Sequence, residues 1–385
     1  MSKAVVIGGS NGIGLAVTLE LIERGYMVHI LDINPPAEGY LREEMFQYTI
    51  FDMTDLDEDV IRELADDEEV KLLMITAGIG GVEKFEYIHP GLINKMMTIN
   101  SVSLTKILSI FYGRIKSKDS FFTGVMGSIS GFISSPMSSV YAASKAAVCR
   151  LVESINIELE VDGYDNRVLN VSPGHVEGTK FDGGEQNMGL VSNLAKEICE
   201  RIEARDTLFI PEYDEIYRGI LDRYHDDPHK FGMDSYQYKL DSGRSTGNKR
   251  GVVGYLSGTF DLFHVGHLNL LKKAKANCDY LIVGVHNSGK WKGKETFVDL
   301  EDRKRIVASC RYVDKVIDSC PEDCDVWPMY HYDKLFVGSD YEGTERFKRY
   351  EEYFKDKGVR IVYFPYTQSV SSTKLREKIK SKNDD

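Results

Sequence analysis

Short apolar runs alternate with longer amphipathic stretches over roughly the first half of the chain. The apolar runs comprise residues 4–9, 27–32, 71–78, 120–128 and 167–174. Such runs are typical of strands that are buried on both faces of a sheet. Two stretches between them, residues 15–25 and 141–160, carry apolar positions at helical spacing. Strands that alternate with helices predict a doubly wound parallel α/β sheet, and the pattern becomes polar and aromatic after residue 180.

A polar stretch rich in Gly and Ser, residues 241–250, has no periodicity and is typical of a linker. The alternation of strands and helices begins again after it. The second set of predicted strands is 251–258, 279–286, 334–340 and 359–365, and the predicted helices are 267–277 and 300–310. The sequence therefore predicts one domain over residues 1–240, a linker over 241–250, and a second, smaller α/β domain over 251–385.

The composition narrows the functional classes. The chain has 385 residues, of which 42% are hydrophobic and 28% charged, as in ordinary globular enzymes. Its net charge of -12 argues against a broad basic surface for nucleic acid, and no apolar run approaches the length of a membrane span. The first residues lack the apolar region of a signal peptide, and the six scattered cysteines show no zinc-like spacing. We expect a cytoplasmic protein with reduced thiols and no resident metal ion.

The segment GGSNGIG, residues 8–14, follows the first predicted strand and opens a helix. Glycines there allow a tight turn and a close approach to a pyrophosphate, which the helix N-terminus would bind. The candidate cofactor-binding residues of this segment are Gly8, Ser10, Asn11, Gly12, Ile13 and Gly14. Asp32 ends the second strand, where a carboxylate can bind the adenosine ribose hydroxyls. The same charge would repel a 2′-phosphate, so NAD(H) is favoured over NADP(H).

The segment YAASK places Tyr141 and Lys145 four residues apart, on one face of a predicted helix. A lysine ammonium beside a phenol lowers the phenol's pKa and makes the tyrosine a usable proton donor near neutral pH. Ser128 ends a predicted strand upstream, where its hydroxyl can bind a substrate carbonyl. These three residues are candidates for carbonyl reduction or alcohol oxidation.

With these motifs, residues 1 to about 240 resemble the short-chain dehydrogenase/reductase family. The resemblance rests on GGSNGIG, Asp32, FDMTD, TAG, Asn100, GSISG, YAASK and SPGHVEGT. It implies a Rossmann-type fold in which Tyr141 is the general acid, Lys145 tunes it, Ser128 orients the carbonyl, and Asn100 supports the site. Further cofactor contacts implied by the family come from Asp52, Met53, Ala77, Gly78 and Val176. The PGHVEGT segment has one residue more than the commonest spacing, which leaves the role of Thr179 open.

The segment GTFDLFHVGH, residues 258–267, places two histidines three residues apart at the start of a predicted helix. A zinc site has little support, because the chain has no HExxH motif and no third ligand at matching spacing. A core position would suit one of the two histidines. Phosphate binding suits both, because imidazoles can donate hydrogen bonds to phosphate oxygens beside helix amides. Gly258 would let the backbone approach a nucleotide closely.

This segment matches the GTFDxxHxGH signature of the nucleotidyltransferase superfamily, and residues 251–385 resemble a glycerol-3-phosphate-type cytidylyltransferase. The resemblance extends to KWKGK, LEDRKRIV, CRYVDKVI, VGSDYEG and SVSSTKLREKI. It implies attack of a substrate phosphate on the α-phosphorus of CTP with release of pyrophosphate, and Mg²⁺ bridging the phosphates. The residues that would act in catalysis are His264, His267 and Lys292. The residues that would bind the nucleotide and its phosphates are Gly258, Thr259, Phe260, Lys294, Arg303, Arg311, Asp340, Ser371, Ser372 and Thr373.

One departure concerns the acceptor. The family has an arginine in a Pro-Arg-Thr-Glu-Gly pattern before the serine–threonine turn, where this chain has Pro365-Tyr366-Thr367. A phosphate-facing charge is lost at Tyr366. Either the acceptor differs from glycerol 3-phosphate, or Lys374 or another cation replaces the charge.

The two resemblances together suggest consecutive reactions. A keto- or aldose phosphate would be reduced by NAD(P)H, and the polyol phosphate would then be coupled to CMP from CTP. The product would be a CDP-alditol of the CDP-ribitol or CDP-glycerol class, used for capsule or teichoic-type polymers. Two alternatives remain open: cytidylyl transfer first, followed by reduction of a CDP-linked carbonyl sugar, or an NAD(H)-sensing domain that regulates the transferase. The partners are small molecules, and both families predict a homo-oligomer.

Overall fold

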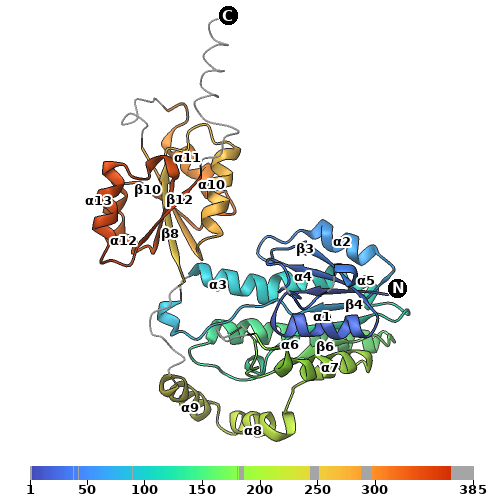
Figure 1. Ribbon diagram of the computed structural model, residues 1–385. Coiled ribbons are helices and arrows are strands. Elements are labelled where there is room, and N and C mark those ends of the chain that lie inside the picture. Colours follow the sequence, from blue (N-terminus) through green and yellow to red (C-terminus); the bar gives the residue numbers. More distant parts are fainter. Residues whose placement is uncertain are drawn as a thin grey trace, which may run out of the picture. The chain divides into compact units, whose positions relative to one another are not determined.

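The chain folds into two compact α/β units, each built on its own sheet (Figure 1). The first unit is formed by residues 1–87 and 93–248, and the second by residues 88–92 and 249–385. The computed structural model describes residues 2–37, 39–41, 43–88, 90–179, 181, 186–242, 251–287 and 296–365.

The first unit contains a seven-stranded sheet in which all paired strands run parallel. The strands are β1 (Lys3–Ile7), β2 (Met27–Asp32), β3 (Phe46–Ile50), β4 (Val70–Ile75), β5 (Phe122–Met126), β6 (Val168–Val171) and β7 (Leu208–Phe209). Their order is β3-β2-β1-β4-β5-β6-β7, so the direction of winding reverses between β1 and β4. The loops after these two central strands diverge, which opens a crevice at the carboxyl edge of the sheet.

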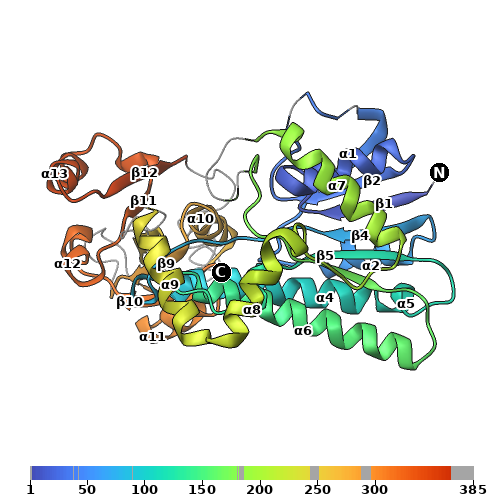
Figure 2. The same cartoon turned by 90° about the horizontal axis from the view of Figure 1, so that it is seen from below.

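The helices that cover the two faces of this sheet are α1 (Gly12–Glu23), α2 (Glu58–Asp66), α4 (Ser103–Ile110), α5 (Tyr112–Ile115), α6 (Ser139–Val161) and α7 (Met188–Glu203). Among the described residues, those of the further helices α3 (Pro90–Met97), α8 (Arg218–Asp226) and α9 (Pro228–Asp241) contribute to neither core. Alternating side chains of β1 explain the two layers. Val5 and Ile7 belong to the core that includes α2, α4 and α6, whereas Ala4 and Val6 belong to the core that includes α1 and α7. Figure 2 shows α1 and α7 side by side.

The structure confirms the predicted parallel, doubly wound sheet. The main addition lies after residue 180, where the sequence pattern becomes polar but the chain forms α7, α8 and α9. Neither α8 nor α9 contains a buried residue. Without a buried face α9 lacks an apolar stripe and its sequence carries little periodic signal, whereas the apolar positions of α8 do recur at helical spacing and could have indicated that helix.

The second unit contains a five-stranded parallel sheet in the order β10-β9-β8-β11-β12. The strands are β8 (Val253–Gly258), β9 (Tyr280–Val285), β10 (Lys315–Asp318), β11 (Lys334–Gly338) and β12 (Arg360–Phe364). The helices are α10 (Val265–Lys275), α11 (Leu300–Ala308), α12 (Trp327–Tyr330) and α13 (Glu345–Phe354). One core joins the sheet to α10 and α11, and the other joins it to α13. The switch of winding between β8 and β11 places the second crevice where the GTFD signature begins.

The predicted linker begins at the last residue of α9, and residues 243–250 of it lie outside the described residues. In the described part of the chain, no helix is long and apolar enough to cross a membrane.

Candidate active sites

The loop between β1 and α1 needs glycine at two of the predicted positions. Gly8 has a φ of +88°, and a Cβ atom on it would lie 2.5 Å from the backbone N of Ala77. A Cβ atom on Gly14 would collide with the carbonyl oxygen of Gly8. The loop can therefore close tightly against the end of β4 while the first residues of α1 line the cleft. A helix N-terminus at the wall of a cleft is suited to an anionic group.

Asp32 is held at the end of β2 by the same loop. Its Oδ2 accepts a hydrogen bond from the N–H of Ser10 at 3.1 Å, and its Oδ1 accepts one from the N–H of Asn34 at 3.1 Å. The Ser10 hydroxyl donates to the carbonyl of Asn34 at 2.7 Å, which ties the loop to the chain after β2. Asp32 is only 8% exposed, yet it lines the cleft. The carboxylate is thus fixed in one orientation beside the glycine loop.

A single cleft of about 1270 Å³ brings most of the predicted first-unit residues together. Those that line it are Gly8, Asn11, Gly12, Ile13, Gly14, Asp32, Asp52, Met53, Ala77, Gly78, Ser128, Tyr141, Lys145 and Val176. Ser10 and Asn100 stand behind this lining and are buried. Thr179, whose role the sequence left open, also lines the cleft, and its hydroxyl donates to the carbonyl of Val176 at 3.1 Å.

Tyr141 and Lys145 lie one turn apart near the start of α6. The Lys145 Nζ atom lies 5.9 Å from the centre of the Tyr141 ring and donates to the carbonyl of Met126 at 2.7 Å. Lys145 is 2% exposed, and burial lowers its pKa to about 8. A buried ammonium this close to a phenol is the electrostatic arrangement that favours a phenolate.

Asn100 connects the end of β4 to the helix that carries Tyr141. Its Oδ1 accepts from the N–H of Ile79 at 2.9 Å, and its Nδ2 donates to the carbonyl of Ile79 at 2.8 Å and to the Ser144 hydroxyl at 2.9 Å. The Ser144 hydroxyl donates in turn to the carbonyl of Tyr141 at 2.7 Å. Asn100 lies in a π-helical turn, Thr98–Val102, which redirects the helix locally. Its contacts are those of a positioning residue.

Ser128 follows β5 and caps a short helical turn. Its hydroxyl accepts a hydrogen bond from the N–H of Ser130 at 3.2 Å and lies 3.5 Å from the carbonyl of Pro173. The contact with Pro173 is at the long limit for a hydroxyl hydrogen bond. The hydroxyl lines the cleft and could therefore exchange this weak contact for a substrate oxygen.

The two histidines of the second unit cap the start of α10. His264 Nδ1 accepts a hydrogen bond from the N–H of Gly266 at 3.1 Å, and His267 Nδ1 accepts one from the N–H of His264 at 3.4 Å. A neutral imidazole whose Nδ1 accepts must carry its proton on Nε2. Both rings therefore present an Nε2–H donor. The Nε2 of His264 is buried and has no hydrogen-bond partner among the described residues.

Burial keeps these two imidazoles neutral near pH 7. Burial, aided by the neighbouring His264, lowers the pKa of His267 to about 4, although Asp261 opposes the shift. Burial also lowers the pKa of His264. The two rings stack with centres 4.1 Å apart, and Phe260 packs against His267 at 5.3 Å. Two stacked cations would repel one another, so the arrangement itself favours neutral donors.

The other predicted nucleotide-binding residues differ in their surroundings. Gly258 ends β8 and Thr259 and Phe260 follow it; Phe260 has a φ of +51°, which is uncommon for a bulky residue. Arg303 is 1% exposed, whereas Arg311 and Asp340 are exposed. The remaining predicted residues, Lys292, Lys294, Ser371, Ser372 and Thr373, and the unusual Tyr366, lie outside the described residues.

Comparisons with known proteins agree with this division of the chain. The family model described as short chain dehydrogenase matches residues 2–188, and the one described as cytidylyltransferase-like matches residues 255–378. The glycerol-3-phosphate cytidylyltransferase of Staphylococcus aureus is 34% identical over 137 residues, which cover 34% of this chain and 96% of that protein. The chain belongs to the cytidylyltransferases. In the same chain, a short-chain dehydrogenase unit precedes the cytidylyltransferase unit.

Two further proteins are similar to one part each. The glycerol-3-phosphate cytidylyltransferase of Bacillus subtilis is 37% identical over 33% of this chain and 95% of its own length. A short-chain dehydrogenase structure from Streptomyces avermitilis covers 62% of this chain and 98% of its own, at 20% identity and a TM-score of 0.49.

In the short-chain dehydrogenase unit, α8 and α9 supply a wall of the cleft that sequence analysis missed. Lys239 of α9 donates to the Ser135 hydroxyl at 2.8 Å and to the carbonyl of Pro136 at 2.7 Å. These contacts hold α9 against the loop that leads into α6. The start of α9 had a signal, because Asp227 caps it and Pro228 occupies its first position.

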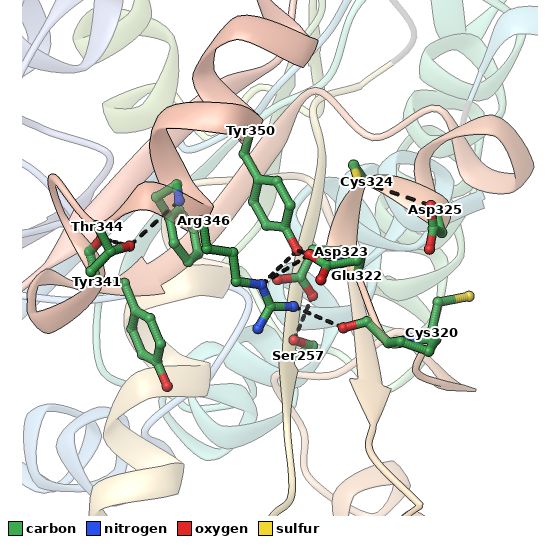
Figure 3. Close-up of polar contacts among 12 residues, drawn as sticks. Ser257, Cys320, Glu322, Asp323, Cys324, Asp325, Tyr341, Thr344, Arg346 and Tyr350 are labelled. Carbon is green, nitrogen blue, oxygen red and sulfur yellow. Dashed lines mark hydrogen bonds and ion pairs between the residues drawn. The ribbon is translucent and has the colours of Figure 1, made fainter. Parts of the chain in front are cut away.

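In the cytidylyltransferase unit, a polar network fixes the last residues of β8 (Figure 3). The Ser257 hydroxyl donates to the buried carboxylate of Asp323 at 2.6 Å. The Tyr350 hydroxyl accepts from the N–H of Asp323 at 2.9 Å and donates to Glu322 at 2.5 Å. Arg346 donates to the same Glu322 carboxylate at 3.0 Å. Since Ser257 immediately precedes the signature, the network sets where the signature begins.

Proposed function

We propose that the short-chain dehydrogenase unit reduces a keto- or aldose phosphate with NADH, and that the cytidylyltransferase unit couples the resulting polyol phosphate to CMP from CTP. The product would be a CDP-alditol of the CDP-ribitol or CDP-glycerol class. In the order proposed, reduction supplies the polyol phosphate that cytidylyl transfer consumes; the alternative is cytidylyl transfer first, followed by reduction of a CDP-linked carbonyl sugar.

The observation that carries this proposal is the polar wall that faces the catalytic side chains of the dehydrogenase cleft. Its charged and hydroxyl-bearing residues are Tyr217, Arg223, Asp226, Asp227, Lys230, Asp234, Ser235, Tyr238 and Lys239. Within the described residues, the side chains of Arg223 and Lys230 form no hydrogen bond or ion pair. Carboxylates and hydroxyls suit the hydroxyl groups of a sugar, and unpaired cations suit a phosphate. An apolar carbonyl compound would make no use of the charges of Arg223 and Lys230.

The lining of the dehydrogenase cleft suits a dinucleotide. The glycine loop packs tightly against the end of β4, the first residues of α1 line the cleft, and Asp32 is fixed beside them. We assign the pyrophosphate to residues 8–14, the adenosine ribose to Asp32, and the adenine to Asp52 and Met53. The carboxylate would repel the 2′-phosphate of NADP(H), so NADH is the expected cofactor. NADH, when bound, supplies the hydride.

The residues around Tyr141 would complete the reduction. The Ser128 hydroxyl donates a hydrogen bond to the substrate carbonyl, and the Tyr141 phenol gives its proton to the same oxygen as the alcohol forms. The Lys145 ammonium stabilises the phenolate that is left. Asn100 holds the end of β4 and the catalytic helix at the correct separation through Ile79 and Ser144.

Cytidylyl transfer would need positioning and charge stabilisation. A phosphate oxygen of the acceptor attacks the α-phosphorus of CTP, the bond to the β-phosphate breaks, and pyrophosphate leaves. The Nε2–H groups of His264 and His267 donate hydrogen bonds to the phosphate oxygens on which charge accumulates. In the described residues no group of three His, Cys, Asp or Glu side chains could hold a metal ion, so we assign no protein ligands to Mg²⁺.

A substrate screen of the full chain tests the proposal. The protein is incubated with NADH, CTP and Mg²⁺ and with C3 to C6 keto- and aldose phosphates, and CDP-alditol is identified by mass spectrometry. We expect one carbonyl phosphate to yield both NAD⁺ and pyrophosphate. Reduction of CDP-linked carbonyl sugars alone would support the opposite order. NADH binding without turnover of any compound would contradict a catalytic dehydrogenase unit.

The pKa of Lys145 predicts the alkaline limit of reduction. Burial disfavours the ammonium form, so this lysine loses its proton near pH 8 instead of above pH 10. We expect kcat/KM for reduction to fall as the pH rises through about 8. Lys145→Arg keeps the charge at high pH, and should remove this limb while lowering the rate. A limb that persists in the arginine variant would assign the pKa to another group.

The cations on the cleft wall predict selectivity for phosphorylated substrates. A hydrogen bond to a charged group contributes about 1.5–3 kcal/mol, so Arg223→Gln and Lys230→Gln should each raise KM for the carbonyl phosphate about 10- to 100-fold. The KM for the same sugar without phosphate should not change. Lys196→Gln, on the exposed side of α7 and outside the cleft lining, is the matched control. Equal effects on both substrates would show that these cations do not recognise phosphate.

A further inference from the structure

Arg303 holds the signature of the cytidylyltransferase unit through backbone carbonyls. Its Nη1 donates to the carbonyls of Thr259 at 2.5 Å and His286 at 2.8 Å. Its Nη2 donates to the carbonyl of Asn287 at 2.8 Å, and its Nε donates to the carbonyl of Val298 at 2.9 Å. The side chain is 1% exposed and is the largest of the fully buried side chains. Most N–H groups of the guanidinium therefore donate to main-chain carbonyls.

Asp261 of the signature makes the complementary contacts. It is 2% exposed, and its Oδ1 accepts hydrogen bonds from the N–H of Phe297 at 3.1 Å and of Val298 at 3.0 Å. Val298 is thus bound through both backbone groups: Arg303 donates to its carbonyl, and Asp261 accepts from its N–H. Their opposite charges also stabilise one another, which offsets part of the cost of burying each.

The two residues tie three separate pieces of chain together. Arg303 connects residues 286–287, which follow β9, to Thr259 of the signature. Arg303 and Asp261 together connect residues 297–298 to the signature. In the sequence, the basic KWKGK motif lies between these two fastened points. The signature backbone between Thr259 and His264 also has positive φ at Phe260 and Leu262, a conformation that persists only where neighbouring structure imposes it.

We infer that Arg303 and Asp261 form a latch, a buried pair that positions His264 and His267 and the two segments 286–287 and 297–298. In this role Arg303 binds main-chain carbonyls and is not a phosphate ligand. The latch holds for any acceptor, so it is independent of the CDP-alditol proposal. Loss of the Arg303 donors or of the Asp261 acceptor leaves buried carbonyl or N–H groups without partners, which shifts the loop that carries His264 and His267; the Asp261 variant must therefore lack a side-chain acceptor.

The test is a double-mutant cycle with Asp261→Leu, which keeps the shape of the side chain but removes its acceptors, and Arg303→Met, together with Arg303→Lys. Misplacement of reacting groups by about 1 Å costs roughly 10²-fold in rate, so each variant should lower kcat for cytidylyl transfer about 10²-fold. Because both residues serve one latch, the double variant should be little worse than either single variant. Lysine cannot reach four carbonyls at once, so Arg303→Lys should resemble Arg303→Met.

Affinity separates the latch from a phosphate ligand. CTP binding is measured by calorimetry on the full chain below the unfolding temperature of each variant, which circular dichroism determines. We expect the dissociation constant for CTP to change much less than kcat. Exposed Arg305→Lys, on the same helix, is the control that should behave as the wild type. Retention of kcat in Arg303→Lys with loss of CTP affinity in Arg303→Met would make Arg303 a phosphate ligand. Additive effects in the double variant, or wild-type activity of Asp261→Leu, would overturn the latch.

Discussion

Tyr141→Phe is expected to lower the rate of carbonyl reduction by about 10²–10⁴-fold, the usual contribution of a positioned general acid. The variant removes only the phenolic oxygen, so the ring contact with Phe181 at 5.7 Å and the packing of α6 should survive. NADH binding, followed by fluorescence, should be unchanged, because the dinucleotide is assigned to other residues. The decrease should therefore appear in kcat.

The fused transferase provides an internal control for this variant. Cytidylyl transfer from CTP to a supplied polyol phosphate should proceed at the wild-type rate in Tyr141→Phe. Tyr112→Phe, a change of the same size on α5 outside the cleft lining, should affect neither reaction. Wild-type reduction in Tyr141→Phe would remove Tyr141 from the chemistry. A parallel loss of cytidylyl transfer would instead favour a dehydrogenase unit that regulates the transferase.

The sequence was sufficient to place side chains whose relative positions depend on local backbone geometry. The residues of GGSNGIG lie in one loop and the first turn of a helix, and Asp32 lies at a fixed distance along a βαβ unit, so the motif alone places them together. The helical spacing of Tyr141 and Lys145 likewise fixes their proximity. In motifs of this kind, the spacing along the chain determines the distances between the side chains.

Residues that act through main-chain partners were not interpretable in the same way. Arg303 has the charge expected of a phosphate ligand, but its partners are four carbonyls from three segments, and any sequence offers carbonyls there. The roles of Asp261 and of the Ser257–Asp323 contact were hidden for the same reason, since tertiary folding alone brings their partners near. In the cleft wall, α9 buries no residue and lacks an apolar stripe, whereas the helical periodicity of α8 was a signal that the sequence analysis did not use.

His267→Ala is expected to lower cytidylyl transfer by about 10²–10³-fold, comparable to the loss of one preorganised donor in an oxyanion site. Because the Nδ1 of His267 accepts a hydrogen bond, its proton lies on Nε2, and two amide variants can test this position. Gln can place an amide N–H near the position of Nε2, whereas Asn is too short to do so. His267→Gln should therefore retain more activity than His267→Asn, although both variants remove the imidazole. Reduction by the dehydrogenase unit should be unaffected in all three.

The neutral state of the imidazoles also predicts how the rate of cytidylyl transfer depends on pH. The pKa of His267 is lowered to about 4, so its protonation does not change between pH 6 and pH 8, and kcat/KM for CTP should be nearly flat over that range. If the imidazolium were the active form, the rate would rise steadily toward pH 6 and beyond. Such a rise in the wild type, absent from His267→Gln, would show that a charged His267 binds the phosphates. A flat profile with partial rescue by glutamine alone is the result expected of a neutral Nε2–H donor.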